Sequence, residues 1–183
     1  MTYCQYINTL GEGEHELHKA YHDHQYGFPI AGDDELFGRL LLEINQAGLS
    51  WTTILKKQDN FRRAYHGFSI PKVARYGEPD FERLINDAGI IRNRLKIRAA
   101  IHNAQVIEGF QREYGSFKNW LDGQTCATKE AWTRLFKETF RFTGGEIVNE
   151  FLVSTGYLPG GHDQGCPVYE KVVASNPPWL RNT

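Results

Sequence analysis

Apolar residues recur at helical spacing along almost the whole chain, and this periodicity limits the folds that the chain can adopt. The longest run predicts a helix over about 92–113, with Ile97, Ala100, Ile101 and Ala104 on one face. Further helices are expected at about 34–47, 50–65, 79–88, 116–121, 128–140 and 146–155, with a helix start at Ser69-Ile70-Pro71. No pair of alternating strands is convincing, and the tail Leu158–Thr183, with four prolines, is expected to be a loop. We therefore predict an all-α fold, a compact array of short helices.

Length and charge narrow the class of protein further. A chain of 183 residues is expected to form one domain, residues 1–183. The net charge of −1 argues against a protein that coats nucleic acid electrostatically, but it allows local basic patches. No signal peptide or membrane-spanning run of about 20 apolar residues is present, so we expect a cytoplasmic protein. Three widely spaced cysteines do not form a disulfide framework, and their thiols are available for metal.

Glu43 is the first candidate for a functional residue. It lies on the same face of the expected helix as Leu36, Leu40 and Ala47. A carboxylate in an apolar stripe is costly unless it has a partner, and it indicates a site more often than a surface glutamate does. Together with the indole of Trp51 and the phenol of Tyr21, it would form a pocket for a flat, cationic ring.

Both residues also have a structural interpretation. Glu43 would then be a half-buried carboxylate paired with Arg39 or Arg92, and Trp51 would pack in the core.

The helices expected at about 79–88 and 92–113 are joined by Gly89-Ile90-Ile91 and resemble a helix-hairpin-helix. Gly89 permits a close approach of the backbone to another molecule. Basic residues crowd the start of the second helix, where free N–H groups and the helix dipole favour an anion: Arg92, Arg94, Lys96 and Arg98. This arrangement is compatible with the binding of an anion, but spacing alone favours an ordinary packing unit with a solvated basic face.

Four residues near the two ends of the chain form a possible set of metal ligands: Cys4, His22, His162 and Cys166. Two thiolates and two imidazoles suit a tetrahedral zinc ion. The spacing His162-x-x-x-Cys166 suits a local loop chelate, whereas the gap between Cys4 and His22 is long. Spacing alone therefore favours ordinary residues over ligands.

Five segments carry a resemblance to a known family: Tyr21–Gly27, Glu43–Trp51, Leu55–Lys57, Asp87–Arg92 and His162-x-x-x-Cys166. They read YHDHQYG, EINQAGLSW, LKK, DAGIIR and HDQGC, and they span nearly the whole chain in order. The chain resembles the bacterial 3-methyladenine DNA glycosylase I family. The resemblance implies base-excision repair of double-stranded DNA with alkylated bases, and no obligate protein partner is inferred. It also implies a structural Zn²⁺ on the four cysteine and histidine residues, which would fasten the two termini together.

The resemblance also implies roles for individual residues. Glu43 and Tyr21 would contact the edge of a base flipped out of the duplex, and Trp51 would stack on its ring. Further pocket and wedge residues would be Tyr6, His18, Gln46 and Leu49. Phosphate contacts would come from Gly89, Arg92, Arg94 and Lys96. The enzyme would be monofunctional, with water as the attacking group and no enzyme nucleophile.

The chain departs from the family pattern at several positions. Tyr6 replaces a tryptophan, and His18 stands where the family usually has a pocket tyrosine. Gln25-Tyr26 replaces Glu-Trp, and Ile44-Asn45 replaces a small polar pair. A protonated His18 would repel a cationic base, so a different modified base is an alternative substrate. A zinc-stapled DNA-binding protein without catalytic activity is the alternative from another class.

Overall fold

The computed structural model describes residues 1–126 and 128–181, and these residues contain helices and no strand. The all-α prediction is confirmed. The chain divides into two compact units. Unit 1 consists of Met1–Ile30 and Asn149–Thr183, and unit 2 consists of Ala31–Val148. The single-domain organisation stays a prediction.

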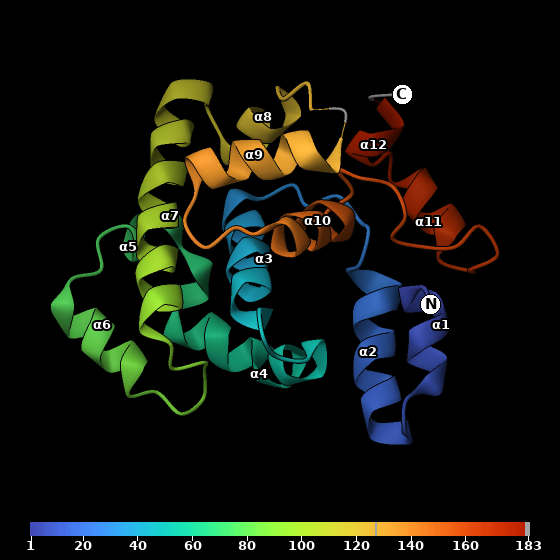
Figure 1. Ribbon diagram of the computed structural model, residues 1–183, viewed down its shortest axis with the longest axis horizontal. Helices are drawn as coiled ribbons and strands as arrows, with labels where there is room; N and C mark the ends of the chain where they lie inside the picture. Colours follow the sequence, from blue (N-terminus) through green and yellow to red (C-terminus); the bar gives the residue numbers. More distant parts are fainter. Residues whose placement is uncertain (127, 182–183) are drawn as a thin grey trace. The chain divides into compact units, whose positions relative to one another are not determined.

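Unit 2 contains the helices that the apolar periodicity predicts, with ends that lie within a few residues of the predicted ones. They are α3 (Asp33–Gln46), α4 (Trp51–Ala64), α5 (Ile70–Val73), α6 (Glu78–Ile85), α7 (Arg94–Tyr114), α8 (Phe117–Asp122), α9 (Lys129–Thr139) and the start of α10 (Gly145–Ser154) (Figure 1). The short 3-10 helix η2 (His66–Phe68), between α4 and α5, was not predicted. The long helix α7 packs on α3, α5, α6 and α8. Of the residues predicted for its buried face, Ile97, Ala100 and Ala104 are buried, whereas Ile101 is partly exposed.

Two consecutive carboxylates at the start of α3 fix neighbouring helices. Asp33 accepts hydrogen bonds from the backbone N–H groups of Phe117 and Lys118, at 2.8 and 3.1 Å, and so caps α8. Asp34 accepts from the N–H of Ile70, at 3.0 Å, at the start of α5. Each bond satisfies a donor that the first turn of a helix leaves unpaired. The start of α3 therefore organises unit 2 around the helix that carries Glu43.

Gly38 lets α3 approach η2 closely. A Cβ atom at this position would lie 2.4 Å from Cδ2 of Phe68, which is fully buried. Any larger residue would displace the ring from the core.

Unit 1 contains α1 (Tyr3–Tyr6), η1 (Ile7–Thr9), α2 (Glu12–His24), the end of α10, α11 (Tyr169–Ala174) and α12 (Pro178–Arg181). The loop predicted for Leu158–Thr183 is therefore wrong where α11 and α12 form, and its last two residues lie outside the described part. The helix α2 was not predicted. Its buried face consists of His18, Tyr21 and His22, so the apolar periodicity that marks the helices of unit 2 is absent.

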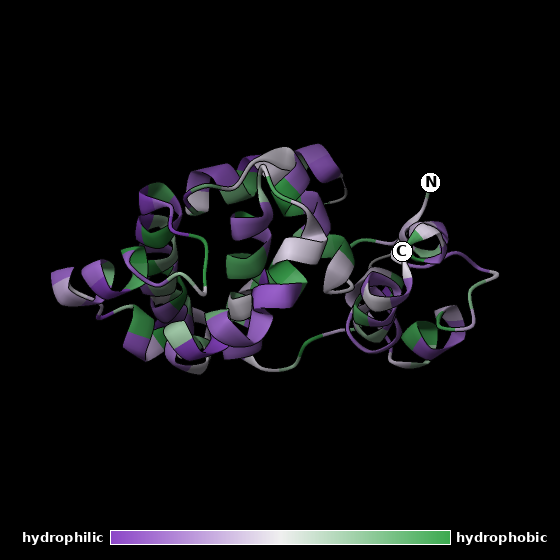
Figure 2. Cartoon of the chain, turned by 90° about the horizontal axis from the view of Figure 1, so that it is seen from below, coloured by the Kyte–Doolittle hydropathy of each residue, from purple (hydrophilic) through white to green (hydrophobic). Residues whose placement is uncertain are grey.

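Figure 2 shows hydrophobic and hydrophilic residues side by side along the helices, as expected for amphipathic elements. Within the described residues, no helix combines the length and apolar character needed to cross a bilayer.

Candidate functional site

The turn between α3 and α4 carries several predicted site residues in unit 2. Glu43, on α3, is only 4% exposed. Gly48 follows the helix with φ of +80°, a backbone conformation that favours glycine. The side-chain amide of Gln46 donates to the carbonyl of Leu49 at 3.0 Å, and the N–H of Leu49 donates to the carbonyl of Gln46 at 2.7 Å. Leu49, 39% exposed, therefore projects from a turn that is held by two hydrogen bonds.

Lys96 holds the same turn from the first turn of α7. Its Nζ donates to the carbonyls of Asn45 at 2.9 Å and Ala47 at 2.7 Å, where α3 ends. A cation at the C-terminal end of a helix is favourable, because the last carbonyl groups lack partners in the helix. The side chain is 5% exposed, and burial lowers the pKa of its ammonium group. Lys96 faces the interior, so the structure gives no support to its predicted contact with a phosphate.

Gly89 lies between α6 and α7, and its close neighbours belong to the protein itself. Its N–H donates to the carboxylate of Asp87 at 2.8 Å, and its carbonyl accepts from the side-chain amide of Asn60 at 3.2 Å. A Cβ atom on Gly89 would lie 3.0 Å from Oδ1 of Asp87 and 3.2 Å from Cγ of Asn60. Asp87 and Asn60 thus approach Gly89 closely within the protein, and the predicted approach of another molecule, DNA, stays a prediction.

The arginines at the start of α7 are exposed. The guanidinium groups of Arg94 and Arg98 lie 5.4 and 4.2 Å from the ring centre of Phe81. No ion pair of Arg92 is recorded among the residues that the structure describes. Leu95, which lies between Arg94 and Arg98 in the sequence, is 69% exposed. The start of α7 thus presents cationic groups and one apolar side chain to solvent.

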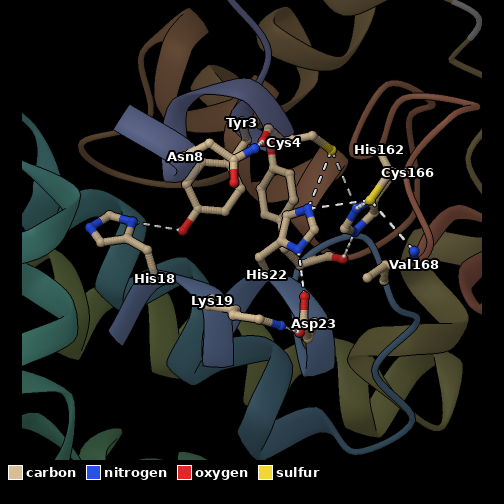
Figure 3. Close-up of polar contacts among 11 residues, drawn as sticks. Tyr3, Cys4, Asn8, His18, Lys19, His22, Asp23, His162, Cys166 and Val168 are labelled. Atoms are coloured by element: carbon tan, nitrogen blue, oxygen red, sulfur yellow. Dashed lines mark hydrogen bonds and ion pairs between the residues drawn. The ribbon is translucent and has the colours of Figure 1, made fainter. Parts of the chain in front are cut away.

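In unit 1, the structure brings together the four predicted metal ligands (Figure 3). The ligand atoms of Cys4, His22, His162 and Cys166 all lie within 4.8 Å of one another. Nε2 of His22 lies 3.3 Å from Sγ of Cys4 and 3.6 Å from Sγ of Cys166. Nδ1 of His162 lies 3.7 Å from each sulfur atom. Ligands at about 2.0–2.3 Å from a tetrahedral zinc ion lie about 3.3–3.8 Å apart, so the four nitrogen–sulfur separations fit such an ion.

The other ring nitrogens of the two histidines also have partners. Nδ1 of His22 lies 2.8 Å from the carboxylate of Asp23, and Nε2 of His162 lies 2.7 Å from the carbonyl of Tyr26. Such acceptors fix the tautomer and leave the opposite nitrogen for a metal. Burial lowers the pKa of His162, which favours the neutral, ligating form. Burial also raises the pKa of Cys4 to about 11, and a bound cation would reverse this shift by stabilising the thiolate.

The predicted pocket residues of unit 1 lie beside this cluster. His18 and Tyr21 are buried on α2, and the ring centre of Tyr6 lies 5.7 Å from that of His18. Glu43 and Trp51 belong to unit 2, so the convergence of all these residues in one pocket stays a prediction.

Comparisons with known proteins decide the family. The sequence model described as methyladenine glycosylase matches residues 12–134. The chain is 39% identical over 172 residues to DNA-3-methyladenine glycosylase 1 of Escherichia coli (strain K12), covering 84% of this chain and 91% of that protein. The chain belongs to the methyladenine glycosylase family. The predicted resemblance is thereby confirmed.

Further relatives agree with this family assignment. The DNA-3-methyladenine glycosylase of Haemophilus influenzae (strain ATCC 51907 / DSM 11121 / KW20 / Rd) is 32% identical, over 85% of this chain and 94% of its own length. A solved structure of 3-methyladenine DNA glycosylase I from Staphylococcus aureus, which shows the structural basis of 3-methyladenine recognition by that protein, has a TM-score of 0.76 and 30% identity. It covers 83% of this chain and 90% of its own. A crystal structure of 3-methyladenine DNA glycosylase I matches with a TM-score of 0.74 and 35% identity, covering 82% and 93%.

The sequence did not reveal three groups that orient or contact histidines in unit 1. Asp23 and the carbonyl of Tyr26 orient the two histidines, and Tyr3 contacts His18 through its hydroxyl group. A carboxylate directly after His22 was a usable signal for the first. Spacing held no signal for the other two, because they depend on how the chain folds back on α2.

Proposed function

We propose that the protein is a monofunctional DNA glycosylase of base-excision repair that hydrolyses the N-glycosidic bond of 3-methyladenine in alkylated double-stranded DNA. Family membership supports the reaction, and the names of the relatives support the substrate. The observation that carries the proposal is the carboxylate of Glu43, which is 4% exposed on a helix whose C-terminal turn leads directly to Trp51. A buried carboxylate is suited to bind a cation that enters from water.

The chemistry of 3-methyladenine explains why these residues suffice for release of the base. A base inside the stack is out of reach, so the nucleotide must rotate into the protein. Methylation at N3 gives the purine a positive charge, which weakens the glycosidic bond and makes the base a good leaving group. Glu43 complements that charge and Tyr21 binds the same edge of the base. Trp51 stacks on the ring with a cation–π contribution of about 0.5–2 kcal/mol. Water attacks the sugar, and no side chain is assigned as nucleophile.

The turn between α3 and α4 fits the task of filling the gap that the flipped nucleotide leaves. Apolar side chains inserted between base steps hold a duplex open. Leu49 is exposed at the tip of this turn, and Gln46 and Lys96 hold the backbone on either side through the hydrogen bonds described above. In this proposal Leu49 is the wedge and Lys96 supports it from inside the protein.

We assign the DNA backbone contacts to the α6–α7 hairpin, as a helix-hairpin-helix. The exposed Arg92 and Arg94 and the N-terminal turn of α7 favour an anion there. These contacts would position the duplex without reading its sequence. Gly89, between the two helices, would also contact the DNA backbone.

The metal of the Cys/His cluster is proposed to be a structural Zn²⁺. The donor set and the separations of its atoms fit zinc, and four protein ligands leave no open position for a water molecule. The ion would supply folding energy, because its ligands come from α1, α2 and the segment before α11. His22 and Cys4 would thereby hold α1 beside Tyr21. We further propose that the protein acts as one domain in the cytoplasm, without an obligate protein partner.

A second candidate function is release of a different modified base. It is favoured by Tyr6 and His18, which depart from the family pattern and lie next to each other in unit 1. The two candidates are separated by chromatography of the bases released from DNA treated with a methylating agent. The proposal expects free 3-methyladenine. Release of another base alone would favour the second candidate, and binding of the duplex without any release would favour a non-catalytic DNA-binding protein.

A further inference from the structure

Unit 2 has an open cavity of about 380 Å³ that the proposed function does not use. It lies between the start of α6 and residues further along α7, and Arg141, from the loop between α9 and α10, also lines it. The hairpin, by contrast, joins the end of α6 to the start of α7 (Figure 1). The cavity is therefore a different place from the hairpin to which the DNA backbone contacts are assigned.

Two arginines line this cavity, and each is held by a different buried residue. The guanidinium group of Arg98 lies 4.2 Å from the ring centre of Phe81, which is 0% exposed. Arg141 is held through its backbone, since its N–H donates to Oδ1 of Asn103 at 2.8 Å and its carbonyl accepts from Nδ2 of Asn103 at 3.1 Å. Asn103, on α7, is 1% exposed. These contacts fix the points at which both arginines leave the core, which lowers the entropic cost of binding a ligand between them.

The positive charge of the two arginines is only partly balanced. Of the described residues that line the cavity, Glu78 is the one carboxylate. Its oxygen lies 4.0 Å from the guanidinium group of Arg98, and both side chains are more than half exposed, so this ion pair contributes little. Across the described part of the chain, no carboxylate lies within ion-pair distance of the guanidinium group of Arg141. The N–H donors of Arg141 are therefore available to an anion.

His102 lines the same cavity and responds to its charge. It is half-buried, and burial, followed by the nearby charge of Arg141, lowers its pKa. A negative charge bound beside Arg141 would act in the opposite direction and raise the pKa of His102. The imidazole ring is thus a reporter for an anion in the cavity.

We propose that Arg98 and Arg141 form a phosphate-binding site in this cavity, separate from the hairpin. A guanidinium group presents its N–H donors in a planar fork that matches the oxygen atoms of a phosphate, and two arginines that line one cavity can bind the same phosphate group. The phosphate group is either a free anion or part of the DNA backbone beside the damaged base. The DNA source rests on the proposed function, whereas the free anion does not.

Titration of the full-length protein with inorganic phosphate, at constant ionic strength, tests the site without DNA. A saturable shift of the imidazole signals of His102 in ¹H–¹⁵N NMR is expected if the site takes free phosphate. Arg98→Met and Arg141→Met should then each weaken phosphate binding by about 10-fold, as expected for loss of hydrogen bonds between charged groups. Arg134→Met, at an exposed arginine on α9 outside the cavity, is the matched control and should bind phosphate as the wild type does.

Binding of duplex DNA distinguishes the two sources of phosphate. If the site takes a backbone phosphate, the slope of log Kobs against log salt concentration should be smaller by about 0.9 in Arg141→Met than in the wild type, and unchanged in Arg134→Met. If the site takes only free phosphate, the slope of Arg141→Met stays at the wild-type value while the NMR titration shows saturable binding.

Absence of a saturable shift at His102 together with an unchanged slope for Arg141→Met would overturn the proposal. Equal losses in Arg141→Met and Arg134→Met would also overturn it, because they would reflect net charge and not a site. Neither measurement depends on base release. Failure of the wild-type protein to release 3-methyladenine would therefore refute the proposed function, and the phosphate site would still be decided by these results.

Discussion

Replacing Lys96 by methionine separates two roles that this lysine can have at the start of α7. As a phosphate contact, it would contribute to DNA binding and little to stability. As the structure has it, the ammonium group donates to the carbonyls of Asn45 and Ala47 at 2.9 and 2.7 Å. Methionine keeps much of the apolar stem and removes the donors, so two carbonyl groups at the end of α3 lose their partner.

The size of the effect follows from these contacts. Hydrogen bonds to a charged group contribute about 1.5–3 kcal/mol each, and relief of the burial of the ammonium group offsets part of that sum. We therefore expect Lys96→Met to lower the free energy of unfolding by about 2–4 kcal/mol. Urea denaturation followed by circular dichroism measures the loss.

DNA binding supplies the second readout for Lys96→Met. Each phosphate contact contributes about 0.9 to the slope of log Kobs against log salt concentration. The account predicts an unchanged slope for Lys96→Met. Arg92→Met, at an exposed cation two residues before α7, is the matched control: its slope should fall by about 0.9, and its stability should stay within about 0.5 kcal/mol of wild type. A normal stability of Lys96→Met together with a reduced slope would refute the reasoning.

Three further predictions concern the metal, the core and the wedge. Cys166→Ser should lose most bound zinc, measured by mass spectrometry of metals, and should melt at a lower temperature. Cys126→Ser, outside the cluster, should keep its metal, and full occupancy in Cys166→Ser would contradict the ligand assignment. Gly38→Ala should lower the free energy of unfolding by about 1–3 kcal/mol in urea denaturation, because its Cβ would lie 2.4 Å from the ring of Phe68. A loss below about 0.5 kcal/mol would show that the space between α3 and Phe68 accommodates a methyl group. Leu49→Ala should slow base release from duplex DNA in a single-turnover assay with little change in stability, since the side chain is 39% exposed, and wild-type rates would exclude the wedge role.

The sequence predicts those helices whose buried face is made of apolar aliphatic or aromatic residues at helical spacing. The face of α7 repeats Ile and Ala at helical spacing, and its ends lie within a few residues of the prediction. Apolar periodicity does not reveal α2, because His18, Tyr21 and His22 form its buried face and carry polar atoms. It also fails at the short helices α11 and α12, because prolines and glycines around them indicate a loop.

The candidate site, like the fold, could be predicted from the sequence only in part. The sequence supplies the residue types of the metal cluster, but Cys4 and His162 are 158 positions apart, and only the fold brings their ligand atoms within reach of one ion. A basic residue at the start of a helix can face solvent or the interior. Arg92 and Lys96 are only four positions apart, yet one is exposed and the other is buried against the end of α3. Side-chain direction of this kind depends on tertiary packing, which the local sequence does not encode.

The account depends most on Glu43 as the carboxylate that binds a cationic purine, and single-turnover release of 3-methyladenine from methylated duplex DNA by Glu43→Gln tests it most directly. The substitution keeps the shape of the side chain and removes its charge. Glu35→Gln, on the same helix at an exposed ion pair with Arg62, is the matched control and should release the base at the wild-type rate. The account predicts that release by folded Glu43→Gln is about 10- to 100-fold slower, as expected for loss of a hydrogen bond to a charged group. Release at the wild-type rate by Glu43→Gln would contradict it.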